Sequence, residues 1–373
     1  MKVVRFKEMS NSEWDAYLGK IRESTYLHAS WYINYLNAIN GKENCQSFIL
    51  FDGNDPIAIC PLSIFKVENF GEEYVEATFK GFPSIYPAVV RLTATQRRRT
   101  IRKVFAQIDA ILKTYAVKRI EFYKHPMNLD VINGDFEIFN TAEAVSYGYF
   151  CDIKNSVIID LKREEERLMH EMSQYQRKRI KKSKNQGLVI REYKGEDKDA
   201  DNIFDDFRLS HVKSAGRLTR PIESWDIMKS LLKENKASLF TASIENGKNI
   251  SYLYCGEFDR LSFGWSQVNI DEYETQYSPR HLLEWEAMMS YKKRGFLYYE
   301  LGVKQDSPQF NYIPTEKEKS ITQVKERYGG ELYSWLHFEK FFDKDLFNKI
   351  YAHRLEKFLN SNYFLSQNEH IYG

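Results

Sequence analysis

The sequence predicts an α/β protein with mixed sheets, built from two similar domains, and three observations support this prediction. The chain has 373 residues, which is long for one hydrophobic core and suits about two. Asn246-Gly247 lies between β-rich segments, and Asn-Gly is the strongest short hairpin signal. The same order of predicted helices and strands occurs twice. Together these features favour tandem α/β units.

The second unit is the clearer one. A strand at 188–195 precedes two helical segments, and residues 237–268 hold three β-rich runs, broken at Asn246-Gly247 and at Asp259-Arg260. The helical segments cover 199–212 and 221–235. We therefore expect an antiparallel meander that follows a strand and two helices.

A further helix is predicted to begin after the meander. Ser278 is a good N-cap, and Pro279 suits the first helical position. Apolar residues follow at helical spacing, and basic residues crowd the last turn before Gly295, before a short aromatic strand at 296–301. Free N–H groups at a helix start attract anions, so we expect the Ser278 end to form an outward-facing anion site, to which Arg280 adds charge.

The first unit repeats this order. Its predicted elements are a strand at 2–6, helices at 11–21 and 29–39, β-rich runs at 45–67 and 73–82, a helix at 93–116 and a strand at 118–124. Because the order recurs, we divide the chain into domains of residues 1–152 and 153–373.

Composition restricts the class of protein. Apolar residues make up 43% and charged residues 28% of the chain, as in globular proteins with a sizeable core. The 54 Lys and Arg residues nearly balance 52 Asp and Glu, which argues against a protein built mainly to coat nucleic acid or an anionic membrane. No stretch approaches the ~18 apolar residues that a membrane helix needs. We therefore expect a cytoplasmic protein without a transmembrane segment.

Several common kinds of site are missing from the sequence. The cysteines are scattered singly, with no CxxC pair and no spacing that matches the histidines, so neither a zinc site nor a disulfide framework is expected. They are Cys45, Cys60, Cys151 and Cys255. There is no Walker loop, dinucleotide fingerprint or Gly-x-Ser-x-Gly elbow. These absences exclude the commonest classes of NTPase, dehydrogenase and hydrolase.

The order strand, two helices, antiparallel meander, helix and parallel strand resembles the GNAT acyltransferase fold. Two such units in one chain resemble the FemAB-like branch of that superfamily, whose members join amino acids to peptidoglycan precursors or acylate sugars and related amines. The likeness is carried by "RHLLEWEAMMSYKKRGFLYYELG" at 280–302, by "SITQVKERYGGELYSW" at 320–335 and by "YLHASWYINYL" at 26–36. The resemblance implies two tandem GNAT-like domains.

The resemblance also implies a reaction. We expect an N-acyltransferase that moves an acyl or aminoacyl group from a thioester donor to an amine of a cell-envelope or surface-sugar precursor. An acyl-CoA-type donor would be a cosubstrate, with no permanently bound cofactor and no metal. In this fold the helix after the meander points at the donor's pyrophosphate. The implied donor-binding residues are Tyr277, Ser278, Arg280 and His281.

Other residues are candidates for catalysis and acceptor binding. Amine acylation needs a base near the donor's reacting end, and Glu300 and Tyr254 are the contenders. His211, Arg217 and Arg220 could hold an anionic acceptor such as a nucleotide sugar or a lipid-linked precursor.

Two alternatives stay open: a tRNA-dependent peptidoglycan bridge transferase, and a catalytically silent double domain that binds RNA or a protein partner. The basic end of 164–187 either compensates a helix dipole or forms a phosphate-binding edge. The segment 91–100 lacks a Ser-Pro start, so we expect the first unit to hold the acceptor and the second to bind the donor.

Overall fold

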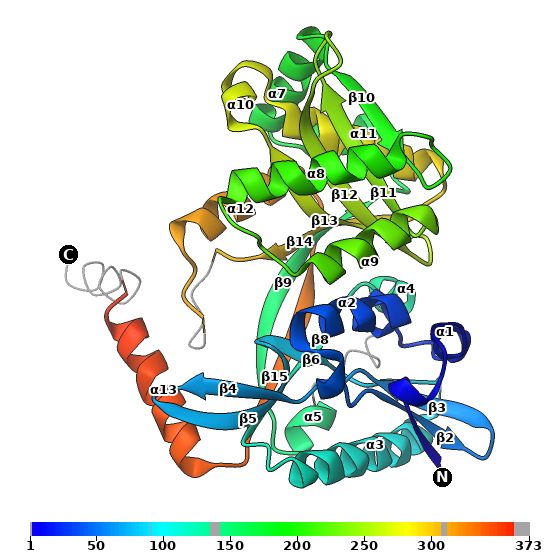
Figure 1. Ribbon diagram of the computed structural model, residues 1–373, viewed down its shortest axis with the longest axis vertical. Coiled ribbons are helices and arrows are strands. Elements are labelled where there is room, and N and C mark those ends of the chain that lie inside the picture. Colours follow the sequence, from blue (N-terminus) through cyan, green and yellow to red (C-terminus); the bar gives the residue numbers. More distant parts are fainter. Residues whose placement is uncertain (1, 91, 135–141, 307–311, 362–373) are drawn as a thin grey trace.

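The computed structural model describes residues 2–90, 92–134, 142–306 and 312–361. Figure 1 shows two lobes stacked along the long axis of the molecule, with the first half of the chain in one lobe and most of the second half in the other. The predicted mixed α/β fold is confirmed.

The first lobe begins with a strand and two helices, as the sequence predicts. In chain order its elements are β1 (Lys2–Arg5), α1 (Asn11–Leu18), α2 (Ser30–Asn40), β2 (Phe48–Asp52), β3 (Asp55–Cys60), β4 (Phe65–Asn69), β5 (Glu72–Phe79), β6 (Phe82–Ile85), β7 (Ala88–Val89), α3 (Ala94–Thr114), β8 (Arg119–Lys124), α4 (Leu129–Ile132) and α5 (Ala142–Ser146). Short 3-10 turns lie at Phe6–Glu8, Tyr26–His28 and Lys42–Asn44.

The second half contains the predicted strand, helix pair, meander, helix and strand. Its elements are β9 (Phe150–Asp160), α6 (Glu165–Glu171), α7 (Gln174–Asn185), β10 (Val189–Tyr193), α8 (Ala200–Ala215), α9 (Ile222–Lys233), β11 (Ala237–Ser243), β12 (Asn249–Phe258), β13 (Leu261–Asn269), α10 (Asp271–Tyr277), α11 (Pro279–Lys293), β14 (Tyr298–Lys304), α12 (Glu316–Glu326), β15 (Glu331–Phe341) and α13 (Lys344–Leu359).

One mixed sheet runs through both lobes. Among the described residues it has 11 strands in the order β10-β11-β12-β13-β14-β9-β15-β8-β6-β5-β4, and a 4-stranded sheet, β1-β2-β3-β7, lies beside it in the first lobe. The predicted meander is confirmed, because β11, β12 and β13 pair antiparallel. Asp259 and Arg260 form its second turn at φ values of 43° and 56°, as the tight turns of hairpins require.

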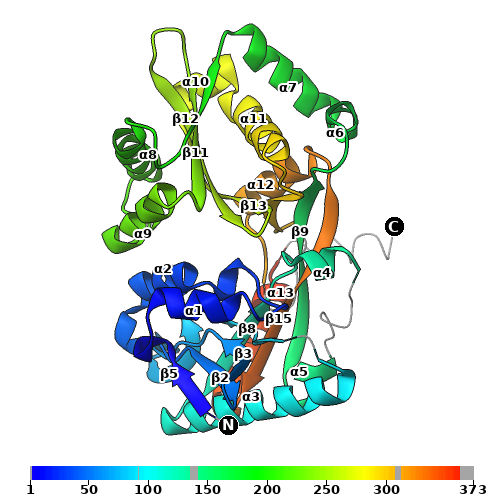
Figure 2. The same ribbon diagram turned by 90° about the vertical axis from the view of Figure 1, so that its right-hand side faces the viewer.

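The long strands β9 and β15 connect the lobes, and Figure 2 shows them side by side along the molecule. β15 pairs with β9 over most of its length and with β8 of the first lobe through Leu336 to Phe341. Position 152/153 therefore lies inside β9, and the division into 1–152 and 153–373 stays a prediction.

The lobes also share an apolar core. It packs α1 and α2 of the first lobe against α8, α9 and the meander of the second. Tyr26 stacks on Phe263 with ring centroids 4.1 Å apart, and Trp31 and Tyr35 contact Trp265. Aromatic rings bury a large apolar area, so this contact fixes α2 against β13.

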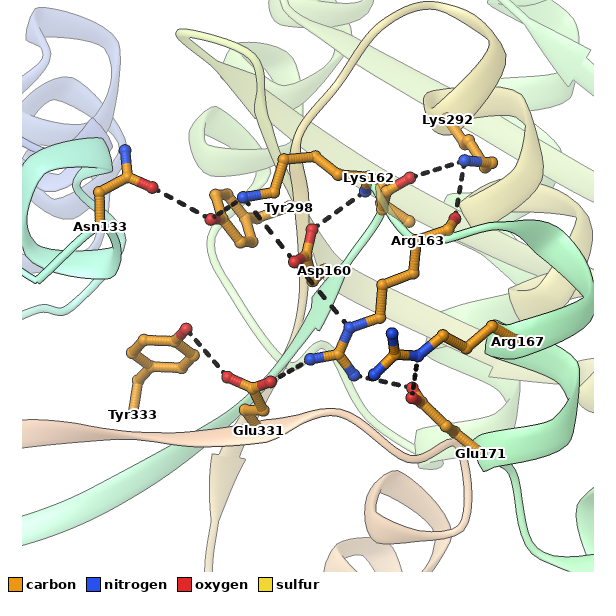
Figure 3. Close-up of polar contacts among 11 residues, drawn as sticks. Asn133, Asp160, Lys162, Arg163, Arg167, Glu171, Lys292, Tyr298, Glu331 and Tyr333 are labelled. Atoms are coloured by element: carbon orange, nitrogen blue, oxygen red, sulfur yellow. Dashed lines mark hydrogen bonds and ion pairs between the residues drawn. The ribbon is translucent and has the colours of Figure 1, made fainter.

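A polar junction forms where β9 leads into α6 (Figure 3). Arg163 contacts Asp160 and Glu171 at 3.9 and 2.8 Å, and it also pairs with Glu331. Tyr298 receives a hydrogen bond from Lys162 and donates one of 3.2 Å to Asn133 of the first lobe. The junction therefore ties the sheet, α6 and the first lobe together.

The basic residues of α7 are mostly used in structural contacts. Arg177 donates to the main-chain oxygens of His170 and Met172, and Lys182 donates to that of Thr275 at 2.7 Å. Such contacts satisfy carbonyl groups at helix ends. They support the structural reading of this basic segment over a phosphate-binding edge.

Candidate active site

A cavity of about 590 Å³ lies between β13 and β14. These strands pair in parallel from Leu261–Tyr298 to Phe263–Glu300, and the pairing then stops. β14 continues along β9 instead. The cavity lies beyond the last pair, between the two strands, the start of α11 and one face of α12. Its polar and charged lining residues include Ser266, Asp271, Arg280, Glu284, Lys317 and Lys325.

Local backbone features keep this opening wide. The β12–β13 register passes from Cys255–Gly264 to Tyr254–Ser266, so Trp265 is the extra residue of a bulge. On β14 the register shifts between Glu300 and Gly302, whose φ of +97° suits glycine. A Cβ on Gly264 would lie only 3.2 Å from Tyr299 Oη. The missing side chain at Gly264 therefore leaves the mouth of the cavity open.

Two different helices contribute cations to the cavity lining. Arg280 projects from α11, and its Nε lies 3.8 Å from Glu274 Oε1. Lys325 extends from α12 and donates to the main-chain oxygen of Val303 at 2.8 Å. Burial lowers the pKa of Lys325, against the pull of the Glu300 and Glu284 carboxylates. Together with Lys317, these groups suit a donor that carries phosphates.

Glu284 is the buried carboxyl group of the cavity, and the sequence reasoning missed it. Its Oε1 accepts a 2.5 Å hydrogen bond from Tyr299 Oη. Burial raises its pKa to about 7, partly opposed by the Tyr299 hydrogen bond and by the charges of Lys325 and Arg280. The available signal was a carboxylate between Leu283 and Trp285 on the face of a helix that packs against the sheet.

The structure corrects the expected anion site at the start of α11. Ser278 occupies the N-cap position with a left-handed φ of 50°, but its side chain does not cap the helix. Its Oγ accepts a 2.8 Å hydrogen bond from Arg179, and Ser183 donates to its main-chain oxygen. His281 lies 3.0 Å from Gln176. The prediction of an outward-facing Ser278 end is therefore wrong, because α7 covers it.

Of the predicted donor-binding residues, the structure places Arg280 in the cavity lining. Tyr277 ends α10, with its ring beside that of Tyr273. Burial, together with Arg280 and Arg179, lowers the pKa of His281 to about 3, so its imidazole is neutral.

Glu300 lies at the last β13–β14 pair, where residues of both lobes meet. Ser156 donates a short hydrogen bond to its carboxylate, and His125 Nε2 of the first lobe lies 3.3 Å from Oε1. Trp335 in turn donates to Ser156 at 2.8 Å. Burial alone would raise the pKa of Glu300, but the charge and hydrogen bonds of His125 and Ser156 keep it lowered.

Tyr254 is placed away from the cavity. Its hydroxyl donates to the main-chain oxygen of Met228 at 2.8 Å, and its ring stacks against Phe207 of α8. Burial raises the pKa of this phenol well above its usual range. Tyr254 therefore packs α8 and α9 onto the meander and does not line the cavity.

The predicted acceptor residues are only partly brought together. Arg220 donates to Tyr35 of the first lobe at 3.3 Å and to Ser266, a cavity residue, at 3.4 Å. His211 lies 3.4 Å from Thr219, and burial and Arg220 lower its pKa. Arg217 lies on an exposed loop. Arg220 therefore reaches the edge of the cavity from the side of the first lobe.

No metal centre or membrane-spanning helix is found in the described part of the chain. Its His, Cys, Asp and Glu side chains form no group of three that could hold a metal ion. None of its helices combines the length and apolar character that crossing a bilayer would need.

Comparison with known proteins gives a family domain and a fold. A family model described as "Acetyltransferase (GNAT) domain" matches residues 171–312. No curated protein matches the sequence of the chain.

Solved structures match almost the whole chain at low identity. FemX matches with a TM-score of 0.63 and 12% identity, covering 94% of this chain and 100% of that one. L-PGS from Bacillus licheniformis matches with a TM-score of 0.56 and 12% identity, covering 93% and 96%. A C-terminal DUF2156 domain from Agrobacterium fabrum matches with a TM-score of 0.57 and 10% identity, covering 94% and 97%. Residues 171–312 are therefore similar to a GNAT acetyltransferase domain, and the chain has a fold like that of FemX, as its resemblance to the FemAB-like branch predicts.

Proposed function

We propose that the protein is an N-acyltransferase that binds a thioester donor between β13 and β14 and transfers the acyl group to an amine. The observation that carries this proposal is the cavity of about 590 Å³ that opens directly after Phe263–Glu300. A donor in this cavity would pass between two strands of the sheet, so its reacting end would be held on rigid elements.

The donor of this proposal is of the acyl-CoA type. Arg280, Lys317 and Lys325 line the cavity and would contact its phosphates. The bulge at Trp265 interrupts the regular pairing of β13. Main-chain N–H groups freed at a bulge can polarise a carbonyl oxygen and stabilise the oxyanion that forms during attack. We place the thioester carbonyl at this part of β13.

The acceptor would approach from the side of the first lobe. Arg220 connects Ser266 of the cavity to Tyr35 of α2, so a negatively charged acceptor would find a cation there. We propose an amine on a cell-envelope or surface-sugar precursor, such as a nucleotide sugar or a lipid-linked precursor. In this proposal the first lobe holds the acceptor in the cytoplasm, where acyl-CoA donors are made.

The experiment combines the purified protein with amino-sugar nucleotides and either a panel of acyl-CoA donors or charged tRNA, with and without ribonuclease, and follows products by mass spectrometry. Acyl transfer that survives ribonuclease is the expected result. Transfer that needs a charged tRNA would replace the thioester with a tRNA-linked donor. Steeply salt-dependent RNA binding without transfer from any donor would overturn the proposal in favour of a silent binding domain.

A further inference from the structure

Glu284 faces the part of the cavity where the donor's reacting end would lie. Gly264 is the first residue of β13 beyond the last β13–β14 pair, and a Cβ placed on it would be 3.6 Å from Glu284 Oε1. The same Cβ would be 3.2 Å from Tyr299 Oη, which donates to that carboxyl group. A group bound along β13 at Gly264 is therefore within contact distance of Glu284.

We propose that Glu284 is the general base that removes the proton from the attacking amine, with Tyr299 as the residue that positions it. This inference rests on the proposed function, because it requires a thioester at the mouth of the cavity. Proton transfer to a positioned carboxylate contributes about 10²- to 10⁴-fold in rate when the group lies within hydrogen-bond reach.

The proposed step balances as follows. The nitrogen of a neutral primary amine attacks the thioester carbonyl carbon, a C–N bond forms, and the extra proton on nitrogen passes to the Glu284 carboxylate. The tetrahedral intermediate then collapses, the C–S bond breaks, and the leaving thiolate takes the proton back from Glu284. The products are an amide and a free thiol, and the carboxylate is regenerated.

The surroundings of Glu284 suit this role. The titratable and charged groups around it are Arg280 on its own helix, Tyr299 on β14, Cys255 on β12, Lys325 on α12 and Tyr328 after α12. Its pKa of about 7 lies near neutral pH, where a base is effective without being fully protonated.

The other candidates in this region are already engaged. Glu300 is held by Ser156 and His125, and its pKa is lowered. A carboxylate that is paired and weakly basic accepts a proton less readily. His281 contacts Gln176 of α7, and its lowered pKa makes it a weak base. Glu284 is therefore better suited than either residue.

The test compares Glu284→Gln with Glu286→Gln. Glu286 lies on the same helix, where it pairs with Lys184, and it is not among the cavity residues. We expect Glu284→Gln to lower kcat by about 10²- to 10⁴-fold, with donor affinity within about twofold of the parent because the amide keeps the shape and the Tyr299 contact. Glu286→Gln should match the parent.

The pH profile and the choice of nucleophile separate a base from a structural residue. The kcat profile of the parent should rise through pH 7, and Glu284→Gln should lose that limb. Hydroxylamine has a less basic nitrogen than an alkylamine, so after attack it gives up its extra proton more readily, and it should reduce the difference in kcat between the variant and the parent. The raised pKa also predicts that the parent loses stability as pH rises from about 4.5 to about 7, and that Glu284→Gln does not.

The outcomes are distinct. In one outcome, the parent and Glu284→Gln transfer the acyl group at the same rate and with the same rise of kcat through pH 7. In that case the assignment of the base is overturned, while the proposed function stands. If the parent transfers nothing from any thioester, both are overturned. The assignment is supported if Glu284→Gln loses the rise of kcat through pH 7 and if hydroxylamine restores part of its kcat.

Discussion

The two lobes contain the same strand junction, and only the second lobe leaves it open. In the first lobe β6 and β8 pair in parallel at Ser84–Phe122 and Ile85–Tyr123. In the second, β13 and β14 pair at Ser262–Tyr299 and Phe263–Glu300. The space beyond these pairs is about 10 Å³ in the first lobe and about 590 Å³ in the second.

The residue that follows the last pair explains much of this difference. It is Tyr86 in the first lobe and Gly264 in the second. The Tyr86 ring is buried against Phe105, Phe122 and Phe338, and the Lys124 ammonium lies 4.8 Å from its centroid. In the first lobe, side chains therefore fill the space beyond the last strand pair. In the second lobe, the corresponding space is an open cavity.

The cations at the helix starts differ in the same way. Arg97, in the first turn of α3, makes a bidentate pair with Glu143 at 2.9 and 3.0 Å and also contacts Glu23. Arg280, at the start of α11, lines the cavity, and its side chain is 33% exposed. A neutralised arginine stabilises the fold but cannot attract an anion, so this contrast supports a single donor site.

The largest expected effect comes from removing the Tyr86 ring, which fills the strand junction of the first lobe. Tyr86→Ala should lower the free energy of unfolding by about 3–5 kcal/mol, because it leaves a cavity among packed aromatic rings. Urea denaturation followed by circular dichroism measures this change.

Tyr86→Phe is the matched control. The Tyr86 hydroxyl has no hydrogen-bond partner among the described residues, so removing it should cost less than about 1.5 kcal/mol. Binding of a thioester donor by Tyr86→Ala in the first lobe would break the comparison, because it would show that the ring alone separates the lobes.

The second prediction concerns a variant that fills the cavity of the second lobe at Gly264. Gly264→Tyr should place a ring where a Cβ already approaches Tyr299 and Glu284. Acyl transfer should fall by about 100-fold or more, since displacing a substrate by about 1 Å costs this much. Steady-state kinetics measure the loss, and the graded variant Gly264→Ala should lie between it and the parent. Undiminished transfer by Gly264→Tyr would place the donor outside this cavity.

A structural feature can be predicted from the sequence when the residues that determine it are close together in the chain. The start of α11 at Pro279 was predictable, because a proline with φ already fixed suits a first helical turn. The meander was predictable from its turn residues. The role of Ser278 was not, because the group that binds its hydroxyl, Arg179, lies 99 residues earlier in the chain.

The site illustrates the same limit. Arg280 was identified from its place in a helix start, and it lines the cavity. Glu284 was missed because its neighbours Tyr299 and Lys325 come from other elements. The contrast between Gly264 and Tyr86 depends on strand register, which periodicity alone does not provide.

The smallest effect concerns the cation that distinguishes the two helix starts. Arg280→Ala should remove a charge-assisted contact to the donor worth roughly 1.5–3 kcal/mol, which weakens donor binding about tenfold or more. Stability should change little, because its partner in the described structure, Glu274, lies 3.8 Å away and both side chains are partly exposed. Isothermal titration calorimetry with an acyl-CoA donor measures the affinity.

Arg167→Ala is the matched control, since Arg167 is a 65% exposed cation on α6 that pairs with Glu171 and is not among the cavity residues. Its donor affinity should equal that of the parent. Equal loss in both variants would mean that overall positive charge attracts the donor. No loss in Arg280→Ala would mean that the start of α11 does not bind the donor, and the contrast between Arg280 and Arg97 would then be one of packing alone.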